Sequence, residues 1–515
     1  MSTDKEQDSN LPSQNNEEQP PAWRPAPNPA VERALPKRTS AALALEESLH
    51  DVRRKIYPRS VKGLFATWRV AFVFFTQIIF YGLPWLQWND RQAVLFDLGA
   101  RKFYIFGMVL WPQDVIYLSV LLIISALALF LFTAIAGRLF CGYACPQTVY
   151  TEIFMWIERK IEGDRVARIR LDEAPWSWKK FRLKFTKHFV WIVVALWTGF
   201  TFIGYFAPIR GLWGEIFTLA LGPWQWFWLF FYSLATWGNG GFLREQVCKY
   251  MCPYARFQSV MVDNDTYVVT YDYKRGEPRG ARSRKVDHRD LGLGDCVDCG
   301  ICVQVCPTGI DIRHGLQYMC IGCGACIDAC DDVMEKMHYP KGLIRYTSER
   351  AIEEGLTDQQ VRKRLVRPRI IIYTTLMILI VAIFFGSLAT RTTLRVDVIR
   401  DRGALGREVP GGLVENVYRV QIINSSENVL KMTLEAQGID GLRVGVGRQG
   451  HDDAMAIEVP ASSNYMLPIV VQAPYDGSKE SGSYPIEFVT HAQPADNPDA
   501  AVTEVRERSS FIYPR

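Results

Sequence analysis

The sequence predicts a multi-domain α+β membrane protein with a five-helix transmembrane core, a cysteine-rich domain and a C-terminal β-sandwich. Three observations carry this prediction. Five long apolar runs interrupt the chain, all twelve cysteines lie between residues 141 and 330, and short alternating apolar stretches dominate from about residue 390 onward. Each pattern is typical of a different kind of structure, so we expect the 515 residues to form several domains.

The five apolar runs are each about 20 residues or longer, which is enough for a helix to cross a hydrocarbon core of ~30 Å. They are too long and too poor in charge for the core helices of a soluble protein. Pro223 interrupts the weakest run, whose many aromatic side chains suit helix ends at the level of the lipid headgroups. The predicted transmembrane helices are about 67–86, 114–136, 188–207, 213–237 and 370–389.

Residues 1–35 are polar and lack periodic apolar positions, so they cannot bury enough apolar surface to offset the entropy of ordering. We predict a disordered cytoplasmic tail there. The membrane core, with the first four predicted helices, then occupies residues 36–255.

Lysine and arginine are unevenly distributed between the loops. They are abundant in 137–187 and 238–369 and rare in 87–113. The positive-inside rule therefore places the N-terminus and both basic segments in the cytoplasm, and five spans then put the C-terminus outside. We expect a multi-pass protein of a bacterial inner membrane with a periplasmic C-terminal domain. The net charge of +5 reflects this topology and is no argument for nucleic-acid binding.

The twelve cysteines all fall in or beside the segments predicted to be cytoplasmic. Thiols stay reduced in the cytoplasm and remain available to bind metal, whereas exported thiols tend to form disulfides. The cysteine distribution and the charge distribution therefore support the same topology by independent arguments.

Residues 256–369 contain two cysteine runs, each spaced C-x2-C-x2-C-x3-C, and Pro307 follows the first. Three closely spaced thiolates wrap one corner of an iron–sulfur cube, and the fourth ligand comes from the other run. A pair of zinc sites is the alternative, but the triplet-plus-one spacing fits it poorly. The sequence thus predicts a bacterial 2[4Fe–4S] ferredoxin-like domain. One cluster is expected on Cys296, Cys299, Cys302 and Cys330, and the second on Cys306, Cys320, Cys323 and Cys326.

Two further cysteine pairs, Cys141/Cys145 and Cys248/Cys252, share the pattern C-x3-C-P at the cytoplasmic ends of predicted spans. The spacing i, i+4 would put both sulfurs of a pair on one helix face, although the proline discourages simple continuation of the helix. Because both pairs lie at the same depth, the four thiols could converge. Four soft thiolates favour Cu(I), zinc or an iron–sulfur cluster, and ordinary buried cysteines are the alternative. The motif indicates a metal or redox site without identifying the metal.

The last predicted span, 370–389, leads into residues 390–515, where short stretches of alternating polarity lie between Gly, Asn, Asp and Pro residues. This pattern is typical of a β-sandwich. The domain contains no cysteine and no catalytic constellation, so we expect it to serve in an interaction or as a spacer.

Taken together, the paired C-x3-C-P motifs, the two-cluster box and the exported β domain resemble the cytochrome c oxidase accessory protein family CcoG, also called FixG or RdxA, over nearly the whole chain. The membrane core is also similar to that of polyferredoxin membrane proteins, but the exported Ig-like domain favours the oxidase-assembly family. The resemblance implies a membrane-bound oxidoreductase that reduces Cu(II) to Cu(I) for the cbb3-type oxidase. It implies two [4Fe–4S] clusters, copper ions, and oxidase-assembly factors or copper chaperones as partners. The expected catalytic copper ligands are Cys141, Cys145, Cys248 and Cys252.

Two function classes remain open besides the cupric reductase. The chain could be an electron-relay or assembly scaffold that passes electrons to a partner without acting on copper, or a cluster-based redox sensor. The sequence contains no flavin or nicotinamide motif, so an external donor, either a quinol or a soluble reductant, must supply the electrons.

Overall fold

The computed structural model describes residues 55–284, 290–364, 366–401, 406–446, 449–452, 454–475, 480–497 and 501–514. The predicted disordered tail, residues 1–35, lies outside the described residues.

Four helices of the described chain are long and apolar enough to cross a membrane: Leu64–Trp85, Pro112–Ala136, Trp178–Ile203 and Pro368–Ala389. They contain the α-helices α3 (Leu64–Gly82), α4 (Val115–Ala136), α8 (Trp178–Ile203) and α17 (Pro368–Ala389). The largest departure from the predicted boundaries is in α8, which begins ten residues earlier than expected because its basic first turns are also helical. The chain is therefore a multi-pass membrane protein.

The prediction of one continuous helix over 213–237 was wrong. The segment forms two helices, α9 (Ile209–Phe217) and α10 (Pro223–Trp237), and Pro223 begins the second of them at a position that proline favours. At 15 residues, α10 is about 22 Å long, shorter than the four candidate spans. A π-helical segment, η3 (Gly238–Leu243), continues it. The structure therefore contains four of the five predicted spans among its described residues, and in place of the fifth it has a shorter helix, α10, that packs along α8.

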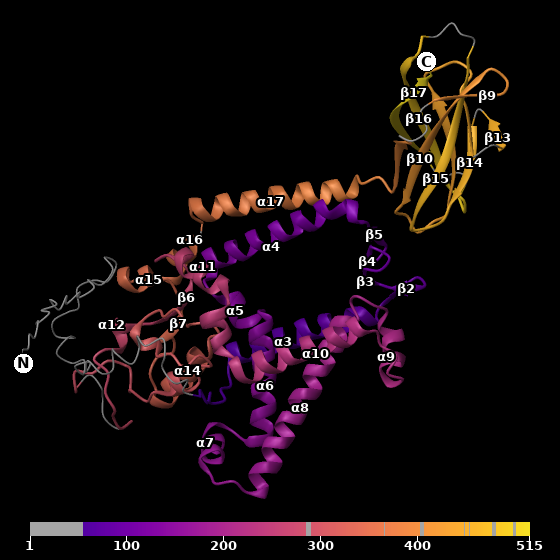
Figure 1. The fold of residues 1–515 in the computed structure, drawn as a ribbon. Helices are drawn as coiled ribbons and strands as arrows, with labels where there is room; N and C mark the ends of the chain where they lie inside the picture. Colours follow the sequence, from indigo (N-terminus) through magenta and orange to yellow (C-terminus); the bar gives the residue numbers. More distant parts are fainter. Residues whose placement is uncertain are drawn as a thin grey trace, which may run out of the picture.

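The long helices connect two ends of the molecule (Figure 1). Helices α4 and α17 lie side by side, and α8 and α10 form a second pair. The cysteine-rich domain lies at one end of α4 and α17, and the C-terminal β domain lies beyond the other end.

Residues 87–114 connect α3 to α4 at the end that faces the β domain. They form two short antiparallel sheets, β1 (Gln87–Trp88) with β2 (Arg91–Gln92), and β3 (Val94–Asp97) with β4 (Lys102–Ile105) and β5 (Met108–Leu110). Lys102 donates from Nζ to the Ser462 carbonyl of the β domain at 2.7 Å. Arg391, just after α17, pairs with Asp114 at 2.6 Å. The β domain therefore rests on this small platform.

At the opposite end, α5 (Leu139–Tyr143), α6 (Pro146–Glu162) and α7 (Arg165–Glu173) follow α4. The buried Glu158 of α6 pairs with Arg168 of α7 at 3.1 Å and with Arg244 at 3.0 Å. Glu162 pairs with Lys187 of α8 at 2.9 Å. Burial acts to raise the pKa of Glu158, but the surrounding positive charges lower it below its ordinary value. Because removing one partner of a buried pair leaves an uncompensated charge, this network fixes α6, α7 and α8 together.

The cysteine-rich domain follows η4 (Val247–Met251) and α11 (Pro253–Met261). Strand β6 (Val268–Tyr271) pairs antiparallel with β7 (Ile344–Thr347). Between these strands lie α12 (Tyr273–Gly276), α13 (Ile301–Gln304), η5 (Ile312–His314) and α14 (Ala325–Met337). The short helices α15 (Glu349–Glu354) and α16 (Asp358–Arg364) lead back to α17.

The C-terminal domain is a sandwich of two antiparallel sheets, ordered β13-β12-β15-β10-β8, with β9 beside β10, and β14-β11-β16-β17. Alternate residues of the long strands point into one apolar core that includes Tyr418, Phe488 and Phe511. The β-sandwich prediction is confirmed. Its strands are β8 (Leu394–Arg400), β9 (Arg407–Val409), β10 (Leu413–Asn424), β11 (Leu430–Gln437), β12 (Arg443–Val446), β13 (Gln449–Asp452), β14 (Ala454–Val459), β15 (Ser463–Pro474), β16 (Gly482–Pro494) and β17 (Thr503–Tyr513).

Candidate metal centre

The two cysteine runs of the ferredoxin-type domain each wrap around a short helix. Gly300 and Gly324 immediately precede α13 and α14 with φ of 64° and 69°, in the left-handed region that favours glycine. These turns bring the first three thiols of each run around the N-terminal end of its helix. The fourth cysteine of each run lies farther along, at Cys306 after α13 and at Cys330 within α14.

The structure sorts the eight thiols into two cavities by exchanging these fourth cysteines. What we call the first cavity is lined by Cys296, Cys299, Cys302 and Cys330. The second cavity is lined by Cys306, Cys320, Cys323 and Cys326, and Cys302 also reaches its edge. The remaining lining is largely apolar in both cavities, with Ile312 and Ile321 in the second. These are the two groupings expected when each run donates its last cysteine to the other cluster.

Burial dominates the electrostatics of these thiols. It raises the pKa of Cys302 and of Cys320 to about 12, and it raises the pKa of Cys330 further. Positive charges oppose this effect, with Arg313 beside Cys302 and Arg138 beside Cys320. Bare thiols would therefore hold their protons at neutral pH, and binding of iron would displace them. Four thiols around each cavity, apolar walls and nearby arginines fit a [4Fe–4S] cluster, which when bound supplies one-electron transfer.

Each C-x3-C-P motif spans a break between two helices. Cys141 lies in α5 and Cys145 is the N-cap of α6, while Cys248 lies in the π-helical η4 and Cys252 is the N-cap of α11. The expectation that both sulfurs of a pair share one helix face was therefore wrong. The proline after the second cysteine occupies the first helical position, so a new helix starts there.

The four cysteines of the two motifs are near enough to act on one another electrostatically, and we call them the four-thiol site. Burial, with a smaller contribution from the neighbouring thiols, raises the pKa of Cys141 to about 11 and that of Cys248 to about 12. Burial also raises the pKa of Cys145, against the opposing effect of backbone N–H groups at the start of α6. The Gln258 side chain donates from Nε2 to the Cys141 sulfur at 3.4 Å. The predicted convergence of the two motifs is thus present in the structure.

The four-thiol site lies directly against the second cavity. A Cβ placed on Gly142 would lie 2.8 Å from the Ile321 carbonyl oxygen and 3.0 Å from the Cys323 Cα, so the two loops are in backbone contact. Tyr143 donates its hydroxyl to the Cys323 carbonyl at 3.3 Å. Cys141 packs in the same apolar cluster as Ile321 and Cys323.

In the described part of the chain, no three His, Cys, Asp or Glu side chains are grouped closely enough to hold a single metal ion. This spacing is compatible with a cubane cluster, in which each thiolate binds a different iron atom. At the four-thiol site it means that a single ion bound by three or four thiolates would require the side chains to move closer together.

Arg138 connects the first C-x3-C-P motif to α11 and to the second cysteine run. From the sequence it is only one of the basic residues that indicate the topology. Its guanidinium donates to the Ala255 carbonyl of α11 at 2.9 Å and to the Tyr318 carbonyl before the second cysteine run. It also donates to the Cys320 carbonyl at 3.5 Å. A signal was available, since this arginine stands three residues before Cys141, but its partners are remote in sequence. Gln258 offered no comparable signal.

Family models match three segments of the chain. Residues 243–349 match a 4Fe-4S dicluster domain, and residues 118–163 match a 4Fe-4S binding domain. Residues 384–514 match the Ig-like fold found at the C-terminal end of FixG. The iron–sulfur character and the Ig-like sandwich are therefore both shown.

Known proteins from two bacteria are similar along most of the chain, and a solved structure is similar over about a quarter of it. Protein RdxA of Cereibacter sphaeroides is 37% identical over 448 residues, covering 85% of this chain and 93% of RdxA. The nitrogen fixation protein FixG of Rhizobium meliloti is 37% identical over 469 residues, covering 85% of this chain and 89% of FixG. A crystal structure of a FixG-related protein from Vibrio parahaemolyticus covers 24% of this chain and 97% of its own, at 22% identity and a TM-score of 0.18.

Proposed function

This chain belongs to the FixG/RdxA family, and we propose that it is a membrane-bound iron–sulfur oxidoreductase that delivers electrons through its ferredoxin-type domain to the four-thiol site. The single observation that carries the proposal is the backbone contact between Gly142 and the Ile321–Cys323 loop. That contact puts a second group of redox-active ligands beside a cluster cavity. Cys296, Cys299, Cys302 and Cys330 would hold one [4Fe–4S] cluster, and Cys306, Cys320, Cys323 and Cys326 would hold the other.

The substrate we propose is Cu(II), which takes up one electron to become Cu(I). Soft thiolates favour the Cu(I) product, so Cys141, Cys145, Cys248 and Cys252 would stabilise the reduced ion. The resemblance to the oxidase-assembly family supports copper, and implies delivery of Cu(I) to assembly factors or copper chaperones of the cbb3-type oxidase.

A direct test uses the purified full-length protein with its clusters reduced under anaerobic conditions. Addition of Cu(II) with a chromogenic Cu(I) chelator should re-oxidise the clusters and form a matching amount of Cu(I). Replacing Cys141 and Cys248 by serine should abolish both signals, whereas Tyr250→Phe, at an exposed position within the second motif, should change neither. Undiminished Cu(I) formation in the double serine variant would overturn the copper assignment.

The family match over residues 118–163 favours a second candidate, in which the four-thiol site holds an iron–sulfur cluster and the chain relays electrons to a partner. Iron analysis separates the two. The copper proposal expects about eight iron atoms per chain, and the relay expects more than that. Iron lost on serine substitution at Cys141 and Cys248 would support the relay.

We also propose that the ferredoxin-type domain faces the cytoplasm of a bacterial inner membrane and that the β domain is periplasmic. The support is the excess of lysine and arginine in 137–187 and 238–369. A reporter enzyme that matures only in the periplasm should be active when fused after the β domain and inactive when fused at the N-terminus. The reverse pattern would overturn this orientation.

A further inference from the structure

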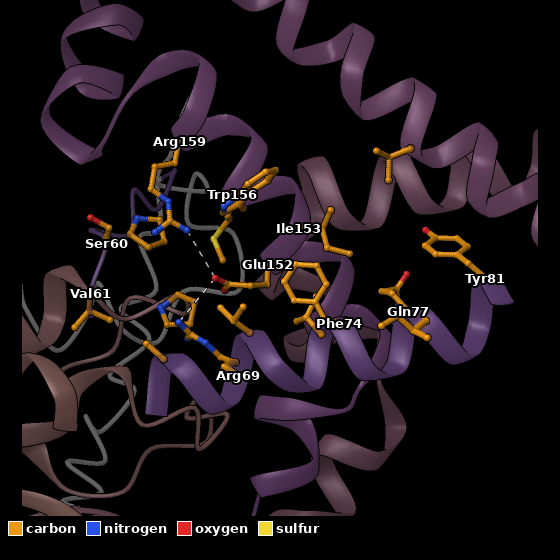
Figure 2. A pocket seen from close by; sticks show the side chains of 18 of the residues that line it. Ser60, Val61, Arg69, Phe74, Gln77, Tyr81, Glu152, Ile153, Trp156 and Arg159 are labelled. Atoms are coloured by element: carbon orange, nitrogen blue, oxygen red, sulfur yellow. Dashed lines mark ion pairs between the residues drawn. The ribbon is translucent and has the colours of Figure 1, made fainter. Parts of the chain in front are cut away.

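The described chain contains a large cavity, about 990 Å³, between α3, α6 and α8 (Figure 2). Helices α3 and α8 are both candidate membrane spans. On α3, the positions Arg69, Val73, Gln77 and Tyr81 follow the i, i+4 spacing of one helix face, and all four line the cavity. This cavity is separate from the two cysteine-lined cavities and from the four-thiol site.

One end of the cavity carries charged groups. The Glu152 carboxylate of α6 lies between two guanidinium groups, 3.8 Å from Arg69 and 3.8 Å from Arg159 (Figure 2). Arg69 is only 8% exposed. A cation and an acid this close to an apolar membrane cavity are costly to keep, which points to a function rather than to packing.

Two buried polar atoms beside the cavity have no hydrogen-bond partner among the described residues. One is the Nε of Arg69, a donor, and the other is the Oε1 of Gln77, an acceptor. The two residues are eight positions apart on α3, about 12 Å along the helix axis. Since buried polar groups are normally satisfied, a ligand with both an acceptor and a donor would complete them.

The rest of the cavity is apolar and extends along α3 toward its far end. It is lined by Phe74, Ile78 and Trp85 from the first span and by Val194 and Trp197 of α8. From Ala66 to Gly82, α3 alone covers roughly 24 Å. The shape therefore suits a polar ring with a long hydrocarbon tail.

The charged end of the cavity lies next to the loop that carries Cys306, a lining residue of the second cysteine-lined cavity. Val305 and Pro307 flank the expected cluster ligand Cys306 in the sequence, and both line this cavity. Arg69 also lies close to the Cys323 thiol, where its charge opposes the rise in pKa that burial causes.

We propose that this cavity binds a lipid-soluble hydroquinone, which is the electron donor of the protein. Arg69 and Gln77 hold the ring oxygens, and Glu152 accepts a proton from a ring hydroxyl. Oxidation to the quinone releases two protons and two electrons. The protons leave through Glu152 toward the Arg159 end, and Cys306, Cys320, Cys323 and Cys326 would hold the [4Fe–4S] cluster that supplies one-electron acceptance. This inference rests on the proposed iron–sulfur function but not on copper as the final acceptor.

A phospholipid is the competing occupant of such a cavity. Its anionic phosphate would approach a carboxylate whose two arginine partners are already paired, and it would offer no donor to Gln77. A neutral hydroquinone offers hydroxyl donors and oxygen acceptors together. The polar groups present therefore favour the hydroquinone.

The first test detects binding without using catalysis. An azido-benzoquinone with a decyl tail is photo-activated on the full-length protein in lipid nanodiscs, and the labelled peptides are identified by mass spectrometry. Labelling should map to α3, α6 or α8 and should disappear with excess decyl-benzoquinone. Gln77→Leu should weaken labelling about five- to tenfold, the effect of one lost hydrogen bond. Phe75→Leu, an exposed position of α3 outside the cavity, should leave it unchanged.

The second test separates proton transfer from binding. With decyl-benzoquinol as the donor, Glu152→Gln should keep labelling within twofold but slow the bleaching of the cluster absorbance about a hundredfold near neutral pH. The remaining rate should also lose its dependence on pH, which a purely structural role of Glu152 would not cause.

Several results would overturn the proposal. Labelling spread over all spans, or suppressed by phosphatidylglycerol and not by decyl-benzoquinone, would show that lipid occupies the cavity. A protein that reduces Cu(II) after chemical reduction yet neither labels nor accepts electrons from the quinol would refute the cavity alone. A protein that labels and accepts quinol electrons but forms no Cu(I) would refute only the copper proposal.

Discussion

The two cysteine-lined cavities are each expected to hold a cluster on four thiols, but their surroundings differ. In the first cavity Cys299 is exposed and the nearby charges, including Asp298, face the outside of the domain. The second cavity is enclosed by Arg69 of α3 and by Gly142 of the first C-x3-C-P motif. One ferredoxin fold thus presents one cluster position to the solvent and the other to the membrane core. In the electron route we propose, the second position would be the junction that receives electrons from the membrane cavity and passes them to the four-thiol site.

Substitution of one cysteine in each cavity should give the largest difference in activity between the two cavities. Cys323→Ser and Cys299→Ser should each remove one cluster and about four iron atoms. Only Cys323→Ser should abolish both quinol-dependent bleaching and Cu(I) formation, because only the second cavity touches both sites. Iron analysis and the Cu(I) chelator assay measure the two outcomes. Equal loss of activity in both variants would show that electrons must pass through the first cluster as well.

A methyl group added where the first C-x3-C-P motif contacts the Ile321–Cys323 loop should have the next largest effect, a loss of stability. Gly142→Ala would place its Cβ 2.8 Å from the Ile321 carbonyl oxygen, so the backbone must shift. We expect a loss of about 1–3 kcal/mol in the free energy of unfolding, as for other overpacked sites. Thermal unfolding followed by loss of cluster absorbance measures it.

Gly211→Ala is the matched control, since nothing lies within 4 Å of a Cβ at that helical position. If both alanine variants unfolded at the temperature of the unmodified protein, the close contact at Gly142 would not be important for stability.

The ferredoxin-type domain also contacts the N-terminus of the first membrane helix, α3. Removing this contact should lower the free energy of unfolding by less than the Gly142 substitution does. Asp328 of α14 accepts the backbone N–H groups of Phe65 at 3.2 Å and Ala66 at 2.7 Å, and so supplies the cap that α3 lacks from its own N-cap residue, Gly63. Asp328→Asn removes the charge at a helix N-terminus and should cost about 1 kcal/mol.

Asp332→Asn, four residues along α14 and exposed, should cost less than about 0.5 kcal/mol, because its ion pair with Lys336 is on the surface. Thermal unfolding of the two variants compares them directly. Equal destabilisation would mean that the docking of α3 does not depend on the Asp328 charge.

The sequence predicted the local patterns well and the contacts between them poorly. Cysteine spacing predicted which thiols share a cavity, because ligation imposes a short-range repeat. Apolar run length predicted five spans, of which four are present in the described residues, because the chain breaks into two helices before Pro223. Asp328 lies inside the second cysteine run and looks like a solvated residue there, so its role as the cap of α3 depends on a partner 262 positions away.

Arg138 and Glu152 illustrate the same limit. The sequence marks Arg138 only as one of the basic residues in 137–187, and it indicates no role for Glu152. Their importance comes from contacts with residues that are far away in the sequence but close in space. Arg138 joins α11 to the second cysteine run, and Glu152 lies between Arg69 and Arg159. Such long-range pairings leave no periodicity in the sequence, so only the folded chain reveals them.

The smallest expected effect concerns the solvent-facing cavity. Arg313 lines the first cavity and pairs with Asp311 at 2.6 Å. Burial acts to raise the pKa of Asp311, but the hydrogen bonds from Arg313 lower it below its ordinary value. A carboxylate with a lowered folded-state pKa stabilises the fold at every pH above its unfolded value of about 3.9, and this contribution disappears as the pH falls through the folded-state pKa.

Asp311→Asn should therefore cost about 0.5 kcal/mol, and the cost should be the same at pH 5.5 and pH 8. Thermal unfolding of the two proteins at both pH values measures it, with the exposed Glu335→Gln as the control for loss of a surface charge. The substitution should also leave quinol-dependent bleaching of the second cluster intact, because the Asp311 carboxylate pairs with Arg313 of the first cavity and is not itself a lining residue of the second. A cost that shrinks between pH 8 and pH 5.5 would contradict the lowered pKa, and slower bleaching would contradict the separation of the two cavities.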